Sequence, residues 1–115
     1  MKKIFVITFL TLQTLALSAQ LNTDRVMAIG RNALYFEDYV LSIQYFNQVI
    51  KVKPYLTEPY FYRAIAKIEL EDYQGAAEDL DEVIARNPFI PMAYYARSFV
   101  EKRLGFFDKA EQDID

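Results

Sequence analysis

The sequence predicts an all-α fold, an α-solenoid in which antiparallel helix pairs stack side by side. The first observation is a repeat with a period of 34 residues: Pro54 and Pro88 are 34 residues apart, and other matches share this spacing without a gap. The second is that apolar residues within each period recur at helical spacing. Stacked helix pairs bury the apolar faces that a single pair leaves open. The other matching sets are Tyr39, Tyr73 and Phe107; Asp38 and Asp72; Val49 and Val83; Tyr60 and Tyr94; Arg63 and Arg97; and Ala76 and Ala110.

The repeat divides the helical domain, residues 20–115, into three units. The first and second units are complete and cover residues 23–56 and 57–90, and the third, residues 91–115, is incomplete. The third unit stops in the middle of its expected second helix. We therefore expect that the chain is part of a longer protein or pairs with something at this end.

Each unit is expected to contain two helices, and the second unit shows the signals for both. Thr57 is a candidate N-cap, and Pro59 falls in the first turn of the first helix. Residues 69–72 form the expected turn, and a second helix is predicted from about residue 73 to residue 86. Pro88 ends it, because proline disfavours the helical conformation in the residue before it. Gly105, in the corresponding turn of the third unit, is typical of a helix C-terminus.

Residues 1–19 have the pattern of a secretory signal peptide. Two lysines are followed by an apolar segment, residues 4–17, and then by the small residues Ser18 and Ala19. Cleavage is expected after Ala19, with cleavage after Ser18 and an uncleaved anchor as alternatives. The protein is then exported across the inner membrane and is periplasmic or associated with the cell envelope. Removal of residues 1–19 leaves 11 basic and 16 acidic residues, a net charge of −5.

The composition argues against an enzyme. The chain has no Cys, His or Trp, so disulfides, zinc catalysis and a Ser-His-Asp triad each lack a required residue. Its acidic balance argues against a nucleic-acid partner. The acidic cluster Glu78, Asp79, Asp81 and Glu82 falls in a predicted helix without the glycine of a calcium loop. We expect no catalytic residues, no metal, no cofactor and no small-molecule substrate.

The repeated positions resemble the tetratricopeptide repeat (TPR), a 34-residue helix pair with characteristic large, small and proline positions. The resemblance covers nearly all of the chain after residue 22 and implies a right-handed superhelix of helix pairs. Position 11, aromatic in most TPR units, departs from the pattern. The matching positions are 4 (Val26, Tyr60, Tyr94), 8 (Gly30, Ala64, Ser98), 17 (Tyr39, Tyr73, Phe107), 20 (Ser42, Ala76, Ala110), 24 (Phe46, Leu80, Ile114), 27 (Val49, Val83) and 32 (Pro54, Pro88); position 11 holds Ala33, Lys67 and Glu101.

Two ion pairs are predicted between the helices of one unit. Arg63 and Arg97 occupy position 7, and Asp79 and Asp113 occupy position 23 of the same two units. These positions lie level across an antiparallel hairpin, so we expect Arg63 to pair with Asp79 and Arg97 to pair with Asp113. Unrelated surface charges and an arginine anion site are the alternatives.

The resemblance also divides the apolar side chains between a core and a groove. Large residues at positions 4 and 17 are expected in the core: Tyr39, Tyr60, Tyr73, Tyr94 and Phe107. Positions 2, 5, 9, 12 and 13 of each first helix are those that TPR arrays turn toward a concave groove. The groove candidates are Met27, Arg31, Leu34 and Tyr35 in the first unit, Phe61, Ile65 and Ile68 in the second, and Tyr95, Phe99, Lys102 and Arg103 in the third.

These groove residues predict a protein-interaction module, an adaptor or scaffold that binds a peptide or partner protein. Exposed aromatic and aliphatic area with a few arginines is typical of interaction sites. The resemblance does not extend to the carboxylate clamp of chaperone-tail binders, whose positions hold Met27, Arg31, Tyr62, Met92 and Ala96 here. The alternatives are a groove filled by a later helix, and a structural spacer or self-assembly element that associates through the open third unit.

Overall fold

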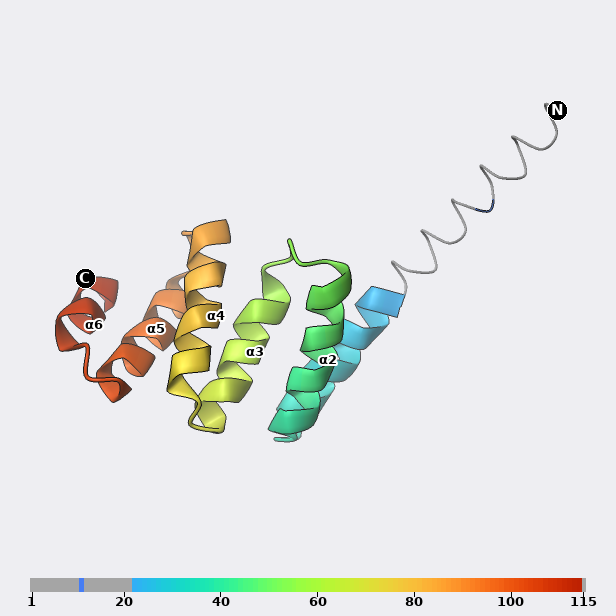
Figure 1. The fold of residues 1–115 in the computed structure, drawn as a ribbon, viewed down its shortest axis with the longest axis horizontal. Helices are drawn as coiled ribbons and strands as arrows, with labels where there is room; N and C mark the ends of the chain where they lie inside the picture. The colour runs from blue at the N-terminus through green and yellow to red at the C-terminus, as the bar shows by residue number, and fades with distance from the viewer. Residues whose placement is uncertain (1–10, 12–21, 115) are drawn as a thin grey trace, which may run out of the picture.

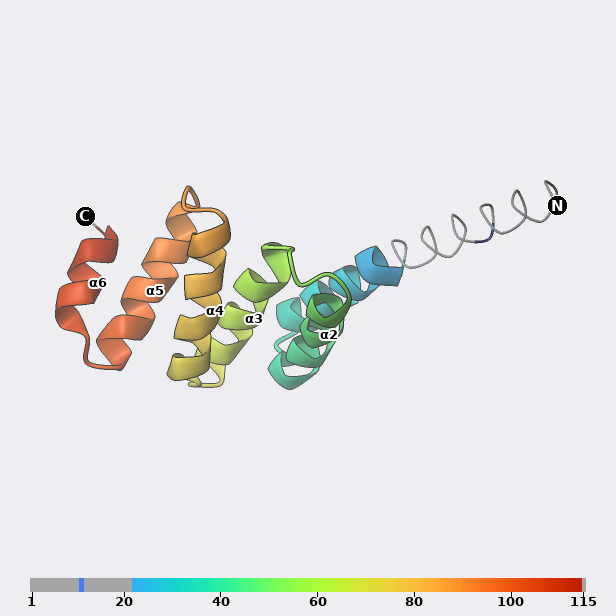
Figure 2. The same cartoon turned by 45° about the horizontal axis from the view of Figure 1, so that its top comes forward.

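The computed structural model describes residue 11 and residues 22–114. Within residues 22–114, six helices follow one another with short connections, and the described residues contain no strand. Successive helices lie side by side in Figures 1 and 2. The all-α solenoid prediction is confirmed. The helices are residues 22–35, α2 (Tyr39–Val52), α3 (Glu58–Glu69), α4 (Tyr73–Arg86), α5 (Pro91–Arg103) and α6 (Phe107–Ile114).

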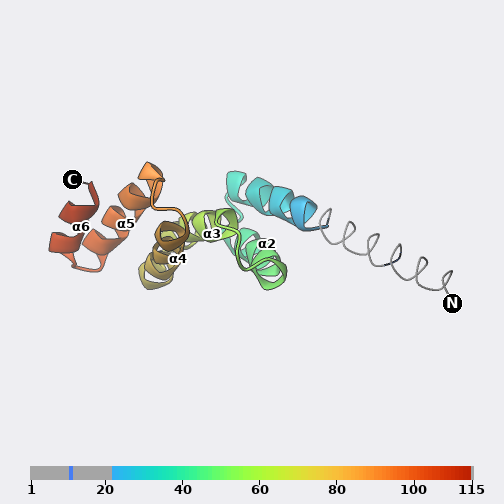
Figure 3. The same cartoon turned by 90° about the horizontal axis from the view of Figure 1, so that it is seen from above.

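The helices form two layers. In Figure 3, the helix of residues 22–35 and α3 lie along one side of the array, and α2 and α4 lie along the other. Helices 22–35, α3 and α5 are the first helices of the three units, and α2, α4 and α6 are the second helices. The side chains of successive first helices can therefore contribute to one shared surface.

The predicted signal peptide lies outside the described residues, Thr11 apart. Among the residues that the structure describes, no helix has the length and apolar character needed to cross a membrane. Helices α2 and α4 have 14 residues each, whereas a helix that crosses the hydrocarbon core needs about 20.

Aspartates cap the second helices of the first two units. The Asp38 carboxylate accepts a hydrogen bond from the backbone N–H of Leu41 at 3.4 Å, and Asp72 accepts one from Gly75 at 3.0 Å. Such caps satisfy amide groups that have no partner inside the helix. Thr57 precedes α3, but its side chain makes no capping hydrogen bond, so the expected Thr57 cap is wrong.

The turn inside each helix pair uses the same backbone conformation. Glu37 and Glu71 have φ angles of 64° and 62°, and Gly105 has a φ angle of 86°. These three residues are 34 positions apart. The left-handed region favours glycine because a Cβ atom crowds the following carbonyl oxygen there. Only the third unit carries the favoured residue, so the repeated turn geometry explains the placement of Gly105.

The core runs along the interface between the layers. One cluster joins α3, α4 and α5, and a second joins helix 22–35 to α2. Leu80, Val83 and Val100 are fully buried in the first, as are Phe46 and Val49 in the second. The buried members are Tyr60, Ala64, Ala76, Leu80, Val83, Ala93 and Val100 in the first cluster, and Met27, Phe46 and Val49 in the second.

Small residues at positions 8 and 20 allow the two helices of a pair to approach closely. A Cβ atom placed on Gly30 would lie 2.7 Å from the ring of Phe46. Ser98 is buried and donates a hydrogen bond of 3.0 Å to the carbonyl oxygen of Ala110 on the facing helix. A larger residue at either position would push the pair apart.

One predicted core residue lies on the surface. Phe107 on α6 is 65% exposed, and Ile114 on the same helix is also exposed. Tyr39 and Tyr73, the equivalents of Phe107, are half-buried. Leu80 and Phe46, the equivalents of Ile114, are buried in core clusters that include residues of the next unit. No described helix follows α6, so the core assignment of Phe107 is wrong for these residues.

Candidate functional site

The predicted groove residues lie on the first helices of the three units, and we call this surface the first-helix face. Arg31 Nη1 lies 3.7 Å from Glu58 Oε2, which links helix 22–35 to α3. Phe61 and Ile68 of α3 lie partly buried against the core cluster that includes α5. The first-helix face consists of Met27, Arg31, Leu34, Tyr35, Phe61, Ile65, Ile68, Tyr95, Phe99, Lys102 and Arg103.

These residues differ in how far they reach the solvent. Tyr35 is 80% exposed, Tyr95 62% and Phe99 43%. Arg31, Lys102 and Arg103 are exposed, whereas Leu34, Phe61, Ile65 and Ile68 are half-buried. Met27 is only 6% exposed and packs in the cluster of Phe46 and Val49. The expectation that Met27 is a surface residue is therefore wrong, and its side chain forms part of the floor beneath the face.

On α5 the exposed aromatic and basic side chains are adjacent. The guanidinium of Arg103 lies 5.1 Å from the ring centroid of Phe99, a cation–π contact. The Phe99 ring also meets Tyr73 edge-on, with centroids 6.3 Å apart. These two contacts hold an exposed aromatic ring in a defined place, which lowers the entropy lost when a partner covers it.

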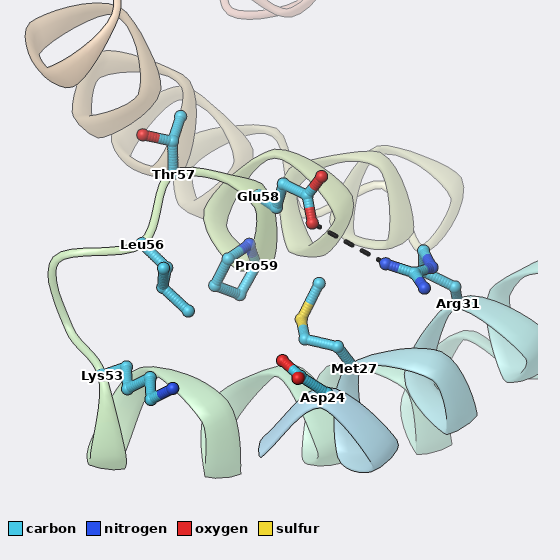
Figure 4. A pocket seen from close by; sticks show the side chains of 8 residues that line it. All are labelled: Asp24, Met27, Arg31, Lys53, Leu56, Thr57, Glu58 and Pro59. Atoms are coloured by element: carbon cyan, nitrogen blue, oxygen red, sulfur yellow. Dashed lines mark ion pairs between the residues drawn. The ribbon is translucent and has the colours of Figure 1, made fainter. Parts of the chain in front are cut away.

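A pocket opens at the N-terminal end of the first-helix face, between the first and second units (Figure 4). Its volume is about 360 Å³, within the range of about 300–1,000 Å³ typical of ligand sites. Met27 points toward its centre, and the dashed line in Figure 4 marks the Arg31–Glu58 ion pair at its edge. The lining residues are Asp24, Met27, Arg31, Lys53, Leu56, Thr57, Glu58 and Pro59.

The chemistry of this pocket is an apolar floor with a charged rim. Met27 and Pro59 are buried, while Arg31 and Glu58 keep 44% and 68% of their side-chain surface exposed. Met27 and Arg31 are groove candidates predicted from the sequence, and Asp24 and Glu58 occupy position 2 of their units, another of the predicted groove positions. Three lining residues, Lys53, Leu56 and Thr57, belong to the connection between the first two units, 53–57. A helical period does not predict which side chains of a connection turn toward a groove.

Both predicted ion pairs are present in the structure. Arg63 donates from Nε to Asp79 Oδ2 at 2.8 Å and from Nη2 to Asp79 Oδ1 at 2.5 Å. Arg97 donates to Asp113 in the same two-pronged way, at 2.8 and 2.6 Å. The hydrogen bonds that each arginine donates to its aspartate raise the pKa of the arginine further above the ordinary range. These ion pairs have a structural role, since each guanidinium already donates two hydrogen bonds to an aspartate of the same chain.

Each arginine also reaches a third helix, a contact that was not predicted from the sequence. Arg63 Nη1 donates to Asn47 Oδ1 at 2.8 Å, and Arg97 Nη1 donates to Asp81 Oδ1 at 3.1 Å. Asn47 and Asp81 lie in the second helix of the preceding unit. In both units the acceptor lies 16 residues before the arginine, and the aspartate partner lies 16 residues after it. That spacing is a signal that could have been read from the sequence.

The structure was compared with known proteins. No protein-family model matches the chain, and no curated protein does either. Among solved structures, the Arabidopsis OM64 TPR domain has a TM-score of 0.79 at 20% identity, with 83% of this chain and 78% of that chain covered. The first TPR domain of Spaghetti (RPAP3), bound to the HSP90 peptide SRMEEVD, has a TM-score of 0.76 at 21% identity, covering 79% and 72%. The fold is that of a TPR domain.

MamA of MSR-1 is also similar to this TPR array, with a TM-score of 0.74 at 14% identity. The match covers 80% of this chain and 53% of that chain, so this chain spans about half of the MamA length. The helix pairs and their stacking are therefore those of the TPR fold.

Proposed function

We propose that the chain is an exported protein-interaction module that binds a peptide or partner protein along the first-helix face. The observation that carries the proposal is the pair of exposed aromatic rings, Tyr95 and Phe99, beside the exposed cations Lys102 and Arg103 on α5. Aromatic residues and arginine are enriched at the centres of protein interfaces. Two similar TPR structures were solved with binding partners, the RPAP3 domain with an HSP90 peptide and the CopN–Scc3 complex.

The proposed partner differs from a chaperone tail. Met27, at a position where tail binders resembling this fold place a lysine, lies buried in the core. Tyr62, at another of those positions, stacks on the ring of Phe46 with centroids 5.8 Å apart. The lysine of the clamp is therefore replaced by a buried side chain without a donor, and the position of Tyr62 is occupied by a ring that packs on Phe46. Affinity is expected to come from burial of apolar area, while Arg31, Lys102 and Arg103 orient acidic groups of the partner. The mainly apolar and basic character of the face supports a binding role rather than a catalytic one.

Truncation of Tyr95 is expected to weaken partner binding by about 2 kcal/mol, or about thirtyfold in Kd, because interface aromatics contribute most of the binding energy. The partner is first captured by a photoreactive residue at position 95, and its affinity is then measured by calorimetry for Tyr95→Ala and Phe61→Ala. Tyr55→Ala is the matched control, since Tyr55 is 68% exposed and belongs neither to the first-helix face nor to the pocket lining. Binding should change little between low and high salt.

Unchanged affinity in both Tyr95→Ala and Phe61→Ala, with helicity retained in circular dichroism, would contradict the groove proposal. Phe61 is partly buried against the core, so Tyr95→Ala is the cleaner of the two variants. A loss of affinity in Tyr55→Ala equal to that in Tyr95→Ala would place the contact elsewhere.

A signal peptide is normally removed when the protein is exported, so the mature protein is expected to begin at Gln20, or at Ala19 if cleavage follows Ser18. The measurement is the intact mass of the protein recovered from the cell envelope and periplasm, with the cytoplasmic fraction as control. Substitution of Ala19 by arginine should block cleavage and leave the longer chain, because the cleavage site needs small residues. A full-length chain found only in the cytoplasm would contradict the proposed export.

A further inference from the structure

The pocket between the first two units lies at one end of the first-helix face, and its walls come from three separate segments. Helix 22–35 supplies Met27, the connection 53–57 supplies Leu56, and α3 supplies Pro59. In Figure 4, these three apolar side chains point toward one another around the cavity. The pocket therefore continues the first-helix face as a separate, deeper place for one group of a ligand.

The connection that forms one wall of the pocket is held in place by the second unit. The carbonyl oxygen of Pro54 accepts hydrogen bonds from Tyr60 Oη at 2.9 Å and from Arg86 Nη2 at 2.8 Å. The guanidinium of Arg86 also lies 4.4 Å from the centroid of the Tyr60 ring. The backbone N–H of Leu56 donates to the carbonyl oxygen of Lys53 at 3.3 Å. A wall held by these contacts is formed before a ligand arrives, which lowers the entropy that binding costs.

The floor of the pocket suits an uncharged apolar side chain. Met27 is 6% exposed, and Pro59 is fully buried. Leu56 packs against the same core cluster as Met27. A charged group on this floor would lose its water without gaining a buried partner, which is costly. An apolar side chain gains free energy by covering the floor.

The rim of the pocket carries both signs of charge. Arg31 and Lys53 are its cations, and Asp24 and Glu58 are its anions. A charged ligand group meets like charges as well as opposite charges here, so the rim offers little net attraction to an acidic or a basic side chain. The rim and the floor therefore agree in favouring an uncharged side chain.

The ion pair at the rim is open enough to receive a peptide group. Arg31 Nη1 lies 3.7 Å from Glu58 Oε2, beyond the range of about 2.7–3.2 Å for a hydrogen bond. In the second unit, by contrast, Arg63 closes on Asp79 at 2.5 and 2.8 Å. A guanidinium donor and a carboxylate acceptor, both exposed, thus lie side by side at the pocket. A peptide group carries the complementary pair, a C=O acceptor and an N–H donor.

We propose, building on the function proposed above, that this pocket binds one uncharged apolar side chain of an extended peptide segment of the partner. The side chain lies on Met27, the adjoining carbonyl oxygen accepts a hydrogen bond from Arg31, and the adjoining N–H donates to Glu58. An extended segment is required, because in a helix these backbone groups are already bonded within the chain. Lys102 and Arg103 remain for the acidic groups of the partner.

The test is an NMR titration of the full chain, labelled with ¹³C at the methionine methyl groups. The peptide acetyl-glycyl-leucyl-glycine amide is expected to shift the Met27 methyl signal saturably. The signal of Met92, which is 64% exposed and does not line the pocket, should stay in place. The peptides with glycine, aspartate or lysine in place of leucine should bind at least about tenfold more weakly, because they bring no apolar side chain to the floor.

Two changes test the backbone hydrogen bonds. Arg31→Met removes the donor from an exposed position and should weaken binding of the leucine peptide about tenfold. Arg25→Met is the matched control: it makes the same change at an exposed position of the same helix outside this pocket, and should bind as the original chain does. A peptide with an ester oxygen in place of the leucine N–H lacks the bond to Glu58, and should also bind about tenfold more weakly.

Three outcomes would overturn the proposal. The first is a Met27 signal that does not saturate with the leucine peptide, and the second is equal affinity for the leucine and aspartate peptides. The third is equal binding by Arg31→Met and by the original chain. None of these decides the role of the first-helix face, which Tyr95→Ala tests with the captured partner. Partner affinity that falls in Tyr95→Ala but not in Arg31→Met would contradict the use of this pocket and leave the proposed function intact.

Discussion

Substitution of Asp79 by leucine is expected to lower the free energy of unfolding by about 3–5 kcal/mol, the cost of leaving a buried charge without its partner. Asp79 has 4% of its side chain exposed and compensates both Arg63 and Lys67. Without it, the guanidinium of Arg63 and the ammonium of Lys67, both on α3, lose the carboxylate of α4 that compensates them. The measurement is urea unfolding of the full chain at pH 7.

The double variant Arg63→Leu/Asp79→Leu separates pairing from burial. It removes both charges of the pair, so it should be less destabilised than Asp79→Leu alone, since a buried pair replaced by apolar residues is often close to neutral. Glu82→Gln is the matched control, because Glu82 pairs with Arg86 at an exposed site, where a pair contributes at most about 1 kcal/mol. A double variant as unstable as the single one would contradict the pairing.

Stability is expected to fall by about 2 kcal/mol between pH 5 and pH 8 because of Glu101. The pKa of Glu101 is about 7 in the folded chain, against 4.5 ordinarily. The folded state therefore binds the proton more tightly than the unfolded state does. This contribution is complete below pH 4.5, and it is lost as the pH rises through about 7. The measurement is urea unfolding of the full chain at both pH values.

Between pH 5 and pH 8, the change in the free energy of unfolding can be assigned to Glu101, because histidine is absent from the chain. The chain contains no histidine, the residue that ordinarily titrates between pH 5 and 8. Asp113 acts in the opposite direction, since its pKa lies below the ordinary 3.8, but its effect falls at lower pH. Glu101→Gln should flatten the pH dependence, whereas Glu111→Gln should retain it. Equal free energies of unfolding of the original chain at pH 5 and pH 8 would contradict a raised pKa of Glu101 in the folded state.

The period of the sequence determined the helix pairs and their contacts, but not the depth of each side chain. The 34-residue spacing was sufficient to predict Asp79 and Asp113 as the partners of Arg63 and Arg97 within one unit, because positions on two antiparallel helices have a fixed relation. Burial depends on what covers a residue. Met27 is buried because Phe46 and Val49 of α2 cover it, and Phe107 is exposed because no described helix covers α6.

Two features could not be predicted from the sequence, the pocket between the first two units and the cluster of charged residues around Arg97 in the third unit. The pocket between the first two units includes several residues of a connection, 53–57, whose side-chain directions have no period. In the third unit, the carboxylates of Asp81, Glu101 and Asp113 gather around Arg97. Glu101 occupies position 11, which in the sequence stands out only as a departure from the TPR pattern. Its meaning required the position of Lys67 beside Asp79 in the preceding unit. Comparison of the second unit with the third shows that position 11 changes from a lysine, Lys67, to a glutamate, Glu101. A pattern of apolar positions contains no information on this change of charge.

The three-helix reach of Arg63 and Arg97 has a consequence for how the array unfolds. In a linear stack, stability is the sum of what each unit contributes alone and what neighbouring units contribute to each other. Arg63 stabilises its own hairpin through Asp79 and the junction with the preceding unit through Asn47. The same side chain therefore contributes to both quantities, so a unit cannot lose its own hairpin without loosening its neighbour. Because Arg63 and Arg97 each join their own helix pair to the preceding one, adjacent repeats are expected to unfold together.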